Sequence, residues 1–242
     1  MSDRIDRIRK AWGQRNFSEE LAFQEEVIID RLVQEAKRSR RILEIGVGNG
    51  RMISILRSRG VKTDFIGIDI NNYIRNAGVQ GVIADCIYLP FQSESFDLVY
   101  SLGVVEHFPE TAAAIREHAR VLKSGGTVLV MTPHLGLATV IKWFQYLYHS
   151  QYRLGSFQAV RGRNLTIGFM RRCFEAAGIE IIACRGAGVR QNTSRVKRLV
   201  KAVLPNRWLH PHLYCLGYKC GLVGESAIST ENSSPYDNPN DV

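Results

Sequence analysis

Short apolar runs recur along the first half of the chain, separated by segments with helical periodicity. The runs cover residues 41–46, 64–69, 81–85, 96–101 and 126–132. They are apolar almost throughout, which is typical of parallel strands covered on both faces. Segments 52–59 and 110–122 have the spacing of helices that connect such strands. The alternation predicts a doubly wound α/β sheet, in which ligands bind outside the carboxyl ends of the strands.

The pattern changes on both sides of this unit. Residues 1–40 have a helical pattern, with Ser18 as a candidate N-cap. An apolar and aromatic segment from residue 135 to 150 is followed by several arginines, and we interpret residues 134–166 as an insertion after the fifth strand. An extra core helix would explain the aromatic residues equally well, but it explains the arginines less well.

Two further strands are expected toward the C-terminus. A helix over about 167–177, ended by Gly178, leads to a strand at 180–184, and the last strand spans 214–222. Between these strands, residues 194–204 form a basic amphipathic pattern. Such a helix suits a membrane surface or a phosphate-rich partner, and a helix packed on the domain edge is the alternative.

Length and composition set further limits. The chain has 242 residues, enough for one full core, and we expect a single domain over residues 1–224. Residues 225–242 are rich in Ser, Asn, Pro and Asp, which predicts a disordered tail. No apolar run approaches the roughly 20 residues of a membrane-spanning helix, and the start lacks a signal-peptide pattern. We therefore expect a cytoplasmic protein.

The five cysteines have no secretory context, so reduced thiols are the default expectation. Cys215 and Cys220 have a spacing that some zinc sites use. Neither a second pair nor a nearby acidic ligand completes such a site, and no metal is predicted.

Positive charge is concentrated in the second half of the chain. The net charge is +9, and residues 118–224 contain 16 Lys and Arg but only two acidic residues, Glu175 and Glu180. The resulting field would attract an anionic acceptor or dock the protein on an anionic membrane. A basic surface that only keeps the protein soluble is the alternative.

A glycine-rich turn follows the first predicted strand. Its glycines are Gly46, Gly48 and Gly50. Nineteen residues past the third glycine, the second strand ends at Asp69, where nucleotide-binding units carry the carboxylate that holds the ribose. The dinucleotide fingerprint needs a glycine where this chain has Arg51, and Glu44 suits a ligand with ammonium and sulfonium charges better than a pyrophosphate. A turn that only packs strand against helix is the alternative.

Three later segments complete a set of motifs. They are Asp85-Cys86 with the following Leu-Pro-Phe and Phe-Asp-Leu-Val sequences, the Glu-His pair at 106–107, and Arg-Val-Leu-Lys-Ser-Gly-Gly at 120–126. In this order, and with the glycine turn, they resemble the class I S-adenosylmethionine (SAM) methyltransferases, whose first motif is E/D-x-G-x-G-x-G. The resemblance covers residues 41–133, and Ser124 stands where the family motif has proline.

The resemblance implies a fold, a cofactor and a set of binding residues. The fold is a doubly wound, mostly parallel sheet of seven strands, in which residues 1–40 cover the cofactor and 134–166 form a lid over the acceptor. The cofactor is SAM, whose ribose Asp69 would hold and whose adenine amine Asp85 would bind. The complete set of expected SAM-binding residues is Glu44, Gly46, Gly48, Asn49, Gly50, Asp69, Ile70, Asp85, Cys86, Ser101 and Leu102.

The implied activity is methyl transfer to an oxygen or carbon atom of a small-molecule or lipid-linked acceptor. The motifs resemble most the group that includes quinone-pathway and small-metabolite methyltransferases. A hydroxyl acceptor would need a base, for which His107 is the nearest candidate because it follows the fourth strand. A structural histidine is the alternative.

Other functions remain open at this point. An RNA methyltransferase is favoured by the basic half, but residues 100–102 lack the Asn/Asp-Pro-Pro-aromatic turn of amino-methylating enzymes. A non-catalytic SAM-binding protein and an NAD(P) oxidoreductase are further alternatives. Peripheral contact with an anionic membrane would be compatible with the charge, and the oligomeric state is not determined by the sequence.

Overall fold

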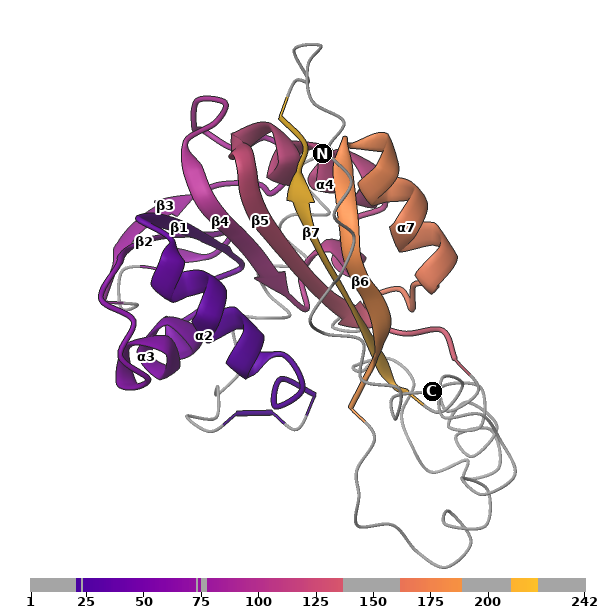
Figure 1. Ribbon diagram of the computed structural model, residues 1–242, viewed down its shortest axis with the longest axis horizontal. Helices are drawn as coiled ribbons and strands as arrows, with labels where there is room; N and C mark the ends of the chain where they lie inside the picture. Colours follow the sequence, from indigo (N-terminus) through magenta and orange to yellow (C-terminus); the bar gives the residue numbers. More distant parts are fainter. Residues whose placement is uncertain are drawn as a thin grey trace, which may run out of the picture.

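The computed structural model describes residues 21–22, 24–72, 74, 78–136, 162–188 and 210–221. A seven-stranded sheet forms its centre, with the order β3-β2-β1-β4-β5-β7-β6 (Figure 1). The strands are β1 (Arg41–Ile45), β2 (Asp64–Asp69), β3 (Gln80–Ile83), β4 (Phe96–Leu102), β5 (Leu122–Pro133), β6 (Ile179–Ala187) and β7 (His212–Lys219). Neighbouring strands pair in parallel from β3 to β5, whereas β7 runs antiparallel to both β5 and β6. The expected mostly parallel, seven-stranded sheet is confirmed.

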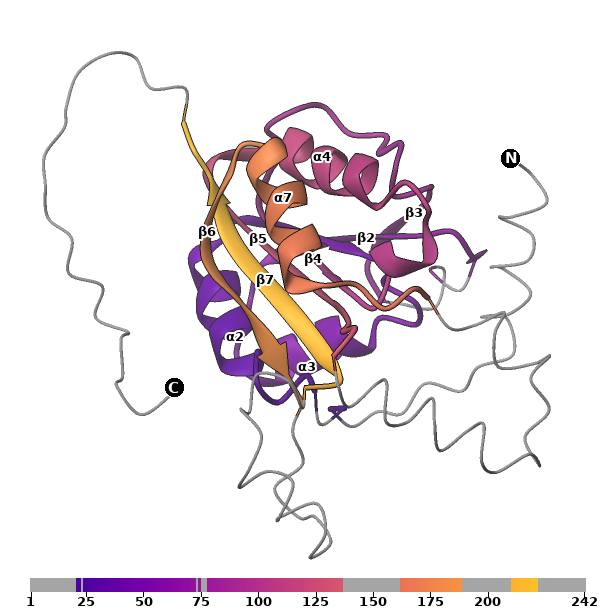
Figure 2. The ribbon, with the colours of Figure 1, turned by 90° about the vertical axis from the view of Figure 1, so that its right-hand side faces the viewer.

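Helices cover both faces of this sheet. Helices α2 (Ile29–Arg38) and α3 (Arg51–Ser58) pack on one face, and α4 (Thr111–Val121) and α7 (Ile167–Ala176) pack on the other (Figures 1 and 2). Successive residues of β4 serve the two layers in turn, because side chains alternate along a strand. Leu98 and Tyr100 therefore join the core under α2 and α3, while Val99 joins the core under α4 and α7.

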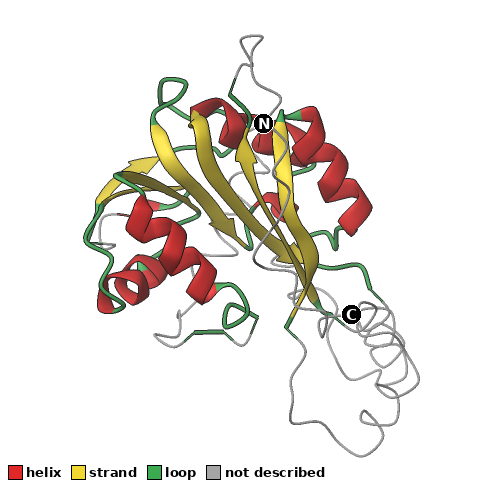
Figure 3. Ribbon diagram, viewed as in Figure 1, coloured by secondary structure: helices red, strands yellow, loops and turns green. Residues whose placement is uncertain are grey.

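The strand order positions a binding crevice. The chain passes from β1 to β2 on one side, and the next strand added on the other side of β1 is β4. The connections that leave the carboxyl ends of β1 and β4 therefore diverge, and a crevice opens between them. The helices and strands that flank this point are drawn in red and yellow in Figure 3.

The described helices agree with most of the expected ones. The helix expected over 167–177 is α7, and Thr166 caps it by accepting a hydrogen bond from the N–H of Phe169. Within the expected N-terminal helical cover, α2 forms its last part. No helix in the described ranges is long and apolar enough to cross a bilayer. Residues 1–20, most of the expected lid, the basic segment 194–204 and the tail lie outside the described residues.

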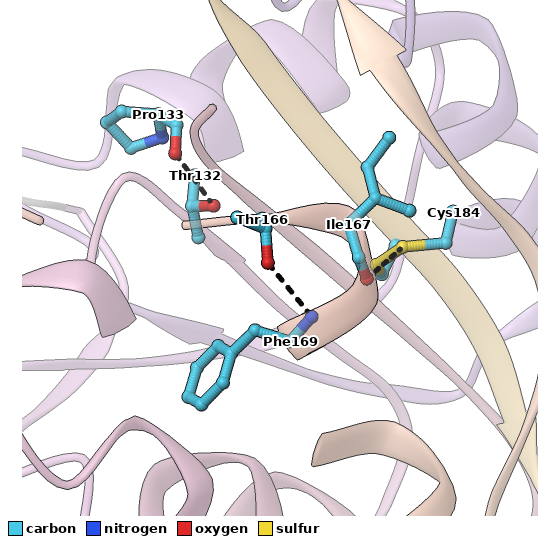
Figure 4. The surroundings of a disulfide bond; sticks show 7 residues. Thr132, Pro133, Thr166, Ile167, Phe169 and Cys184 are labelled. Atoms are coloured by element: carbon cyan, nitrogen blue, oxygen red, sulfur yellow. Dashed lines mark hydrogen bonds between the residues drawn. A yellow bond between two sulfur atoms is a disulfide. The ribbon is translucent and has the colours of Figure 1, made fainter. Parts of the chain in front are cut away.

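The expectation of reduced thiols is wrong for two cysteines. A disulfide joins Cys184 of β6 to Cys215 of β7, and Cys86, Cys173 and Cys220 are free. The two bonded residues are direct partners in the antiparallel register of β6 and β7, which brings their Cα atoms within 4.1 Å. Figure 4 places this bond beside the start of α7, where the Cys184 Sγ lies 3.9 Å from the carbonyl oxygen of Ile167. Sequence spacing gave no signal, because the strand pairing creates the contact.

Candidate active site

A cavity lies at the carboxyl ends of β1, β2 and β4, at the crevice that the strand order predicts. Nine of the expected site residues line it: Glu44, Gly46, Gly48, Asn49, Asp69, Ile70, Cys86, Leu102 and His107. Gly50, Asp85 and Ser101 are not part of this lining. The sheet thus gathers residues from four separate segments of the sequence into one concave site.

The glycine turn after β1 is held against two neighbouring strands. The N–H groups of Gly46 and Val47 donate to the carbonyl oxygen of Ile68 at the end of β2. Gly46 has a φ of +78°, and a Cβ atom there would lie only 2.2 Å from a methyl carbon of Val104. A side chain at position 46 would therefore separate the turn from the loop after β4, and only glycine fits.

Asp69 ties this turn to β2. Its Oδ2 accepts a hydrogen bond of 2.9 Å from the N–H of Gly48, and its Oδ1 accepts one of 2.8 Å from the N–H of Asn71. Each carboxylate oxygen can accept more than one hydrogen bond, so both retain capacity for hydroxyl donors of a ligand. The two backbone contacts fix the orientation of the carboxylate at the rim of the cavity.

Asp85 carries a buried oxygen without a partner. Its Oδ1 accepts from the N–H of Ile87 at 3.1 Å, but Oδ2 is buried and forms no hydrogen bond with the part of the chain that the structure describes. Its sequence neighbours Ala84 and Cys86 both line the cavity. A buried acceptor that lacks a donor is costly, so this oxygen fits the amino group of a bound ligand.

Glu44 is a buried acid in the cavity wall. Its side chain lies at the end of β1, and the hydroxyl group of Tyr100 on β4 donates to its Oε2 at 2.9 Å. Burial raises the pKa of Glu44 to about 8, against the lowering effects of the Tyr100 hydrogen bond and the charge of Arg51. The group is therefore ready to lose its proton when a cation binds beside it.

Two further charged residues line the cavity, and the sequence analysis did not identify either as a ligand contact. Arg51 forms a bidentate ion pair with Glu25, with one N–O distance of 2.9 Å. Glu25 lies before α2, and Arg51 begins α3. The sequence analysis treated Arg51 only as the residue that replaces the third glycine of the dinucleotide fingerprint. Nothing in the sequence distinguished Glu25 from the neighbouring acidic residues.

The turn after β4 contributes the 3₁₀ helix η2 (Val105–His107). His107 lines the cavity, and its Nε2 lies 3.9 Å from Oε1 of the adjacent Glu106. Gly103, Val104 and Phe108 also line the cavity and belong to the same turn, although the sequence analysis did not assign them to the site. The hypothesis of a catalytic His107 is compatible with this position.

Ser101 points away from the cavity. Its hydroxyl group is buried and lies 3.1 Å from Nε2 of His118 on α4, whose Nδ1 lies 2.7 Å from the carbonyl oxygen of Ala114. A carbonyl can only accept, so Nδ1 carries the proton and Nε2 accepts from Ser101. Leu102 and Gly103, the next two residues, line the cavity in its place.

These features define a class of protein. The fold is a doubly wound α/β domain with a nucleoside-type site, and the described lining carries three carboxyl groups, from Glu25, Glu44 and Asp69, against one guanidinium group. Such a lining disfavours a pyrophosphate and suits a ligand with net positive charge. SAM fits this chemistry, because it combines a ribose, an adenine amine and two cationic groups, and the free oxygen of Asp85 matches the amine.

Comparison with known proteins assigns the central part of the chain to a domain family. Residues 43–130 match the family described as methyltransferase domain. Residues 43–130 thus form a class I SAM-dependent methyltransferase domain, and SAM is the cofactor of this class of enzymes.

The names of the curated relatives of this domain refer to different substrates. A probable tRNA methyltransferase 9B of Homo sapiens is 33% identical over 106 residues, which make up 42% of this chain and 23% of that protein. A ubiquinone/menaquinone biosynthesis C-methyltransferase, UbiE, of Xylella fastidiosa is 31% identical over 127 residues, or 47% of this chain and 49% of the relative. The chain therefore matches at most about half the length of these relatives.

A solved structure agrees with the fold. Geranyl diphosphate C-methyltransferase from Streptomyces coelicolor, determined with Mg²⁺, geranyl diphosphate and S-adenosyl-L-homocysteine, superimposes with a TM-score of 0.62. The alignment covers 89% of this chain and 98% of that chain, at 9% sequence identity. At this identity the likeness concerns the fold alone.

Proposed function

We propose that this protein transfers the methyl group of SAM to an oxygen or carbon atom of a small-molecule or lipid-linked acceptor. The observation that carries the proposal is the meeting of Asp69, Glu44 and the glycine turn in one cavity beside the unpartnered oxygen of Asp85. Each of these groups matches one part of SAM, and they come from three different strands.

The residues of the cavity have separate tasks in this proposal. Asp69 holds the ribose hydroxyls, Asp85 accepts from the adenine amine, and Glu44 faces the ammonium group of the methionine portion. When bound, SAM supplies a methyl group that its sulfonium has already activated. The protein then has to align the acceptor and exclude water, and the apolar side chains of Val104 and Phe108 in the lining serve the second task.

The acceptor class rests on less direct support. Among the relatives, UbiE is named for quinone biosynthesis, and a tocopherol O-methyltransferase of Arabidopsis thaliana is 27% identical over 113 residues. The positive charge of residues 118–224 favours an acceptor with an anionic group. These observations support a small or lipid-linked acceptor without naming it.

Labelled SAM tests the proposal. The protein is incubated with methyl-labelled SAM and a cell extract separated into lipid, RNA, protein and small-molecule fractions. We expect label in the lipid or small-molecule fraction, and much less label with the Asp69→Asn variant when SAM is below its saturating concentration. Binding of SAM without label in any fraction would instead favour a SAM-binding protein without this activity.

An RNA methyltransferase is the second candidate. It is favoured by the human relative named as a probable tRNA methyltransferase and by the excess of basic residues in the second half. Label that enters the RNA fraction and disappears after ribonuclease treatment would select this candidate. Retention on RNA should then fall steeply with salt, because each phosphate contact releases a counterion.

Contact with an anionic membrane belongs to the same proposal, as does a location in the cytoplasm. Residues 194–204, which motivate the membrane contact, lie outside the described residues. Flotation with vesicles of anionic or neutral lipid tests it, and we expect binding only to the anionic vesicles and at low salt. Equal binding to neutral vesicles would contradict an electrostatic contact.

A further inference from the structure

Glu106 is a buried carboxyl group that the proposed mechanism does not yet use. It lies in η2, directly after β4, and its side chain is 3% exposed. Its Oε2 is buried and has no hydrogen-bond partner among the described residues. An unpartnered buried carboxyl oxygen costs stability, so its presence requires an explanation outside folding.

The carboxyl group of Glu106 lies behind the cavity wall. Its Oε1 is 3.9 Å from Nε2 of His107 and 3.6 Å from the position that a Cβ atom would take on Gly103. Both His107 and Gly103 line the cavity. Because Gly103 has no side chain, no side chain at this position separates the Glu106 carboxyl group from the cavity.

The opposite side of Glu106 is closed by the chain before α7. A Cβ atom on Gly162 would lie 2.1 Å from Cγ of Glu106, and the N–H of Arg163 donates to the Glu106 carbonyl oxygen at 3.0 Å. The guanidinium group of Arg163 donates instead to the carbonyl oxygens of Phe108 and Pro109 and to Oγ1 of Thr111. Residues 162 and 163 thus hold the Glu106 side chain against the cavity wall without neutralising it.

Charged neighbours of Glu106 are few among the described residues. Titratable side chains on the elements around it are His107 in η2, Arg163 before α7 and His134 at the end of β5, while the first turn of α4 carries no acid. Arg163 and His134 have hydrogen bonds to other groups. The carboxyl group is therefore free to respond to a charge that arrives in the cavity.

We infer that Glu106 is the proton-accepting group on the acceptor side of the cavity, and that the acceptor presents an O–H or N–H group to it. The inference rests on the proposed methyl transfer. It keeps the oxygen acceptors of that proposal and adds acceptors with an N–H group. His107 would then orient the acceptor beside Glu106 instead of acting as the base.

The proton balance of this step is simple. The acceptor oxygen or nitrogen forms a bond to the methyl carbon while the carbon–sulfur bond breaks and its electron pair stays on sulfur. The acceptor loses its proton to the Glu106 carboxylate, which becomes a carboxylic acid, and the electron pair of the O–H or N–H bond stays on the acceptor atom. The proton later leaves to solvent, so no further reactant is needed.

The electrostatics of Glu106 agree with this role. Burial raises its pKa to about 8, close to the range in which a general base works near neutral pH. A positive charge within about 4–6 Å lowers the pKa of a carboxyl group by roughly 1–3 units. The sulfonium charge would therefore convert Glu106 to its carboxylate form when the reactive cofactor is in place.

The test compares two ligands that differ only in charge at the reacting centre. SAM carries the sulfonium charge, whereas S-adenosylhomocysteine has a neutral sulfur and the same methionine ammonium. The pKa of Glu106 is followed by NMR of ¹³C-labelled glutamate carboxyl groups in the full chain, without ligand and with each ligand. Through-bond correlation to the backbone assigns the signal, and its loss in Glu106→Gln confirms the assignment.

We expect the Glu106 pKa to be lower with SAM than with S-adenosylhomocysteine by about one unit or more. Glu44 is the internal control, since it faces the ammonium group that both ligands carry, and its pKa should fall equally with both. Equal Glu106 pKa values with the two ligands would overturn the inference. The proposed function would be left standing in that case, whereas absence of calorimetric binding of both ligands would overturn the function itself.

A second variant separates chemistry from structure. Glu106→Gln keeps the shape of the side chain and should bind S-adenosylhomocysteine with wild-type affinity. Glu175→Gln, on the exposed side of α7, serves as the matched surface control. A Glu106→Gln protein that unfolds at the same temperature but loses S-adenosylhomocysteine binding would assign Glu106 to the cofactor instead, which contradicts the inference.

Discussion

At the scale of single residues, carboxyl groups decide which ligand the cavity accepts. Glu25, Glu44 and Asp69 surround one guanidinium group, that of Arg51, in the described lining. A dinucleotide site places its pyrophosphate at this turn and would be repelled by these acids. A ligand with an ammonium and a sulfonium group is attracted by these acids, and the ion pair with Glu25 offsets the positive charge of Arg51.

Asp69→Asn should weaken the binding of S-adenosylhomocysteine by about 10- to 100-fold. The reason is that each hydrogen bond between a hydroxyl group and the charged carboxylate contributes about 1.5–3 kcal/mol. Isothermal titration calorimetry measures the change. Asp64→Asn, an exposed position at the start of the same strand, is the control and should bind as the wild type does. Unchanged affinity in Asp69→Asn would refute its role at the ribose.

Glu44 predicts a proton release on binding. With a pKa of about 8, most Glu44 side chains are protonated at pH 7, and the ligand ammonium stabilises the carboxylate form. S-adenosylhomocysteine should therefore release up to about one proton per molecule bound at pH 7. Calorimetry in buffers of different ionisation enthalpy counts the protons. Glu44→Gln should release none, and equal release by both proteins would contradict the assignment.

At the scale of elements, a buried polar pair fixes α4 to the centre of the sheet. His118 is fully buried and links Ser101 of β4 to the carbonyl of Ala114 within α4. Burial lowers the pKa of His118 to about 4, so the ring stays neutral in the folded protein. The contact between His118 and Ser101 therefore fixes the end of β4, from which the turn that carries His107 begins.

This pair predicts an acid-sensitive stability. Between pH 6.5 and about 4, the unfolded chain protonates His118 and the folded chain does not, so stability falls as the pH drops through this window. The loss should reach about 3 kcal/mol near pH 4. Urea unfolding at several pH values compares the wild type with His118→Gln, which should be less stable at pH 7 but depend less on pH. Parallel pH profiles would contradict this account.

The antiparallel ribbon of β6 and β7 carries the second element-scale prediction. The disulfide between Cys184 and Cys215 closes a loop with a sequence separation of 31 residues. In the chain-entropy account, opening such a loop costs about 3–4 kcal/mol of stability. Urea unfolding of the protein with and without a reductant measures the loss, and Cys173→Ser serves as a free-thiol control. A Cys184→Ser/Cys215→Ser variant that loses no stability would contradict the contribution.

At the scale of the whole molecule, the sheet brings segments that are distant in the sequence together at one site. Residues from before α2, from the glycine turn, from β2, from the loop after β3 and from the turn after β4 meet at one edge. The excess of positive charge lies in the later half, which contributes β5, β6, β7 and the segment before α7.

Ligand binding should stabilise the entire domain, because the site joins so many segments. S-adenosylhomocysteine at 100 times its dissociation constant adds about 2.7 kcal/mol. For a chain of this size, the expected rise in melting temperature is about 5–10 °C. Differential scanning fluorimetry measures it, with NAD⁺ as the control ligand. A shift with NAD⁺ and none with S-adenosylhomocysteine would contradict the cavity chemistry argued above.

The sequence by itself determined the parallel part of the central sheet and predicted which residues would meet at its edge. Continuous apolar runs identify buried parallel strands, and their order places the ends of β1 and β2 at one edge. The glycine turn and Asp69 could be recognised because each role depends on local backbone form and on position relative to a strand. The number of strands and their mostly parallel pairing came from the family resemblance, not from periodicity, and the antiparallel direction of β7 is known only from the structure.

Only the tertiary structure decided which side chains face each other across segments. It turned Ser101 toward His118, paired Glu25 with Arg51, joined Cys184 to Cys215 and left one carboxyl oxygen of Glu106 without a hydrogen-bond partner among the described residues. A linear pattern records spacing along one element, whereas these contacts depend on how elements pack against each other. Burial and hydrogen-bond supply follow from that packing, and they determine the protonation of the acids in the site.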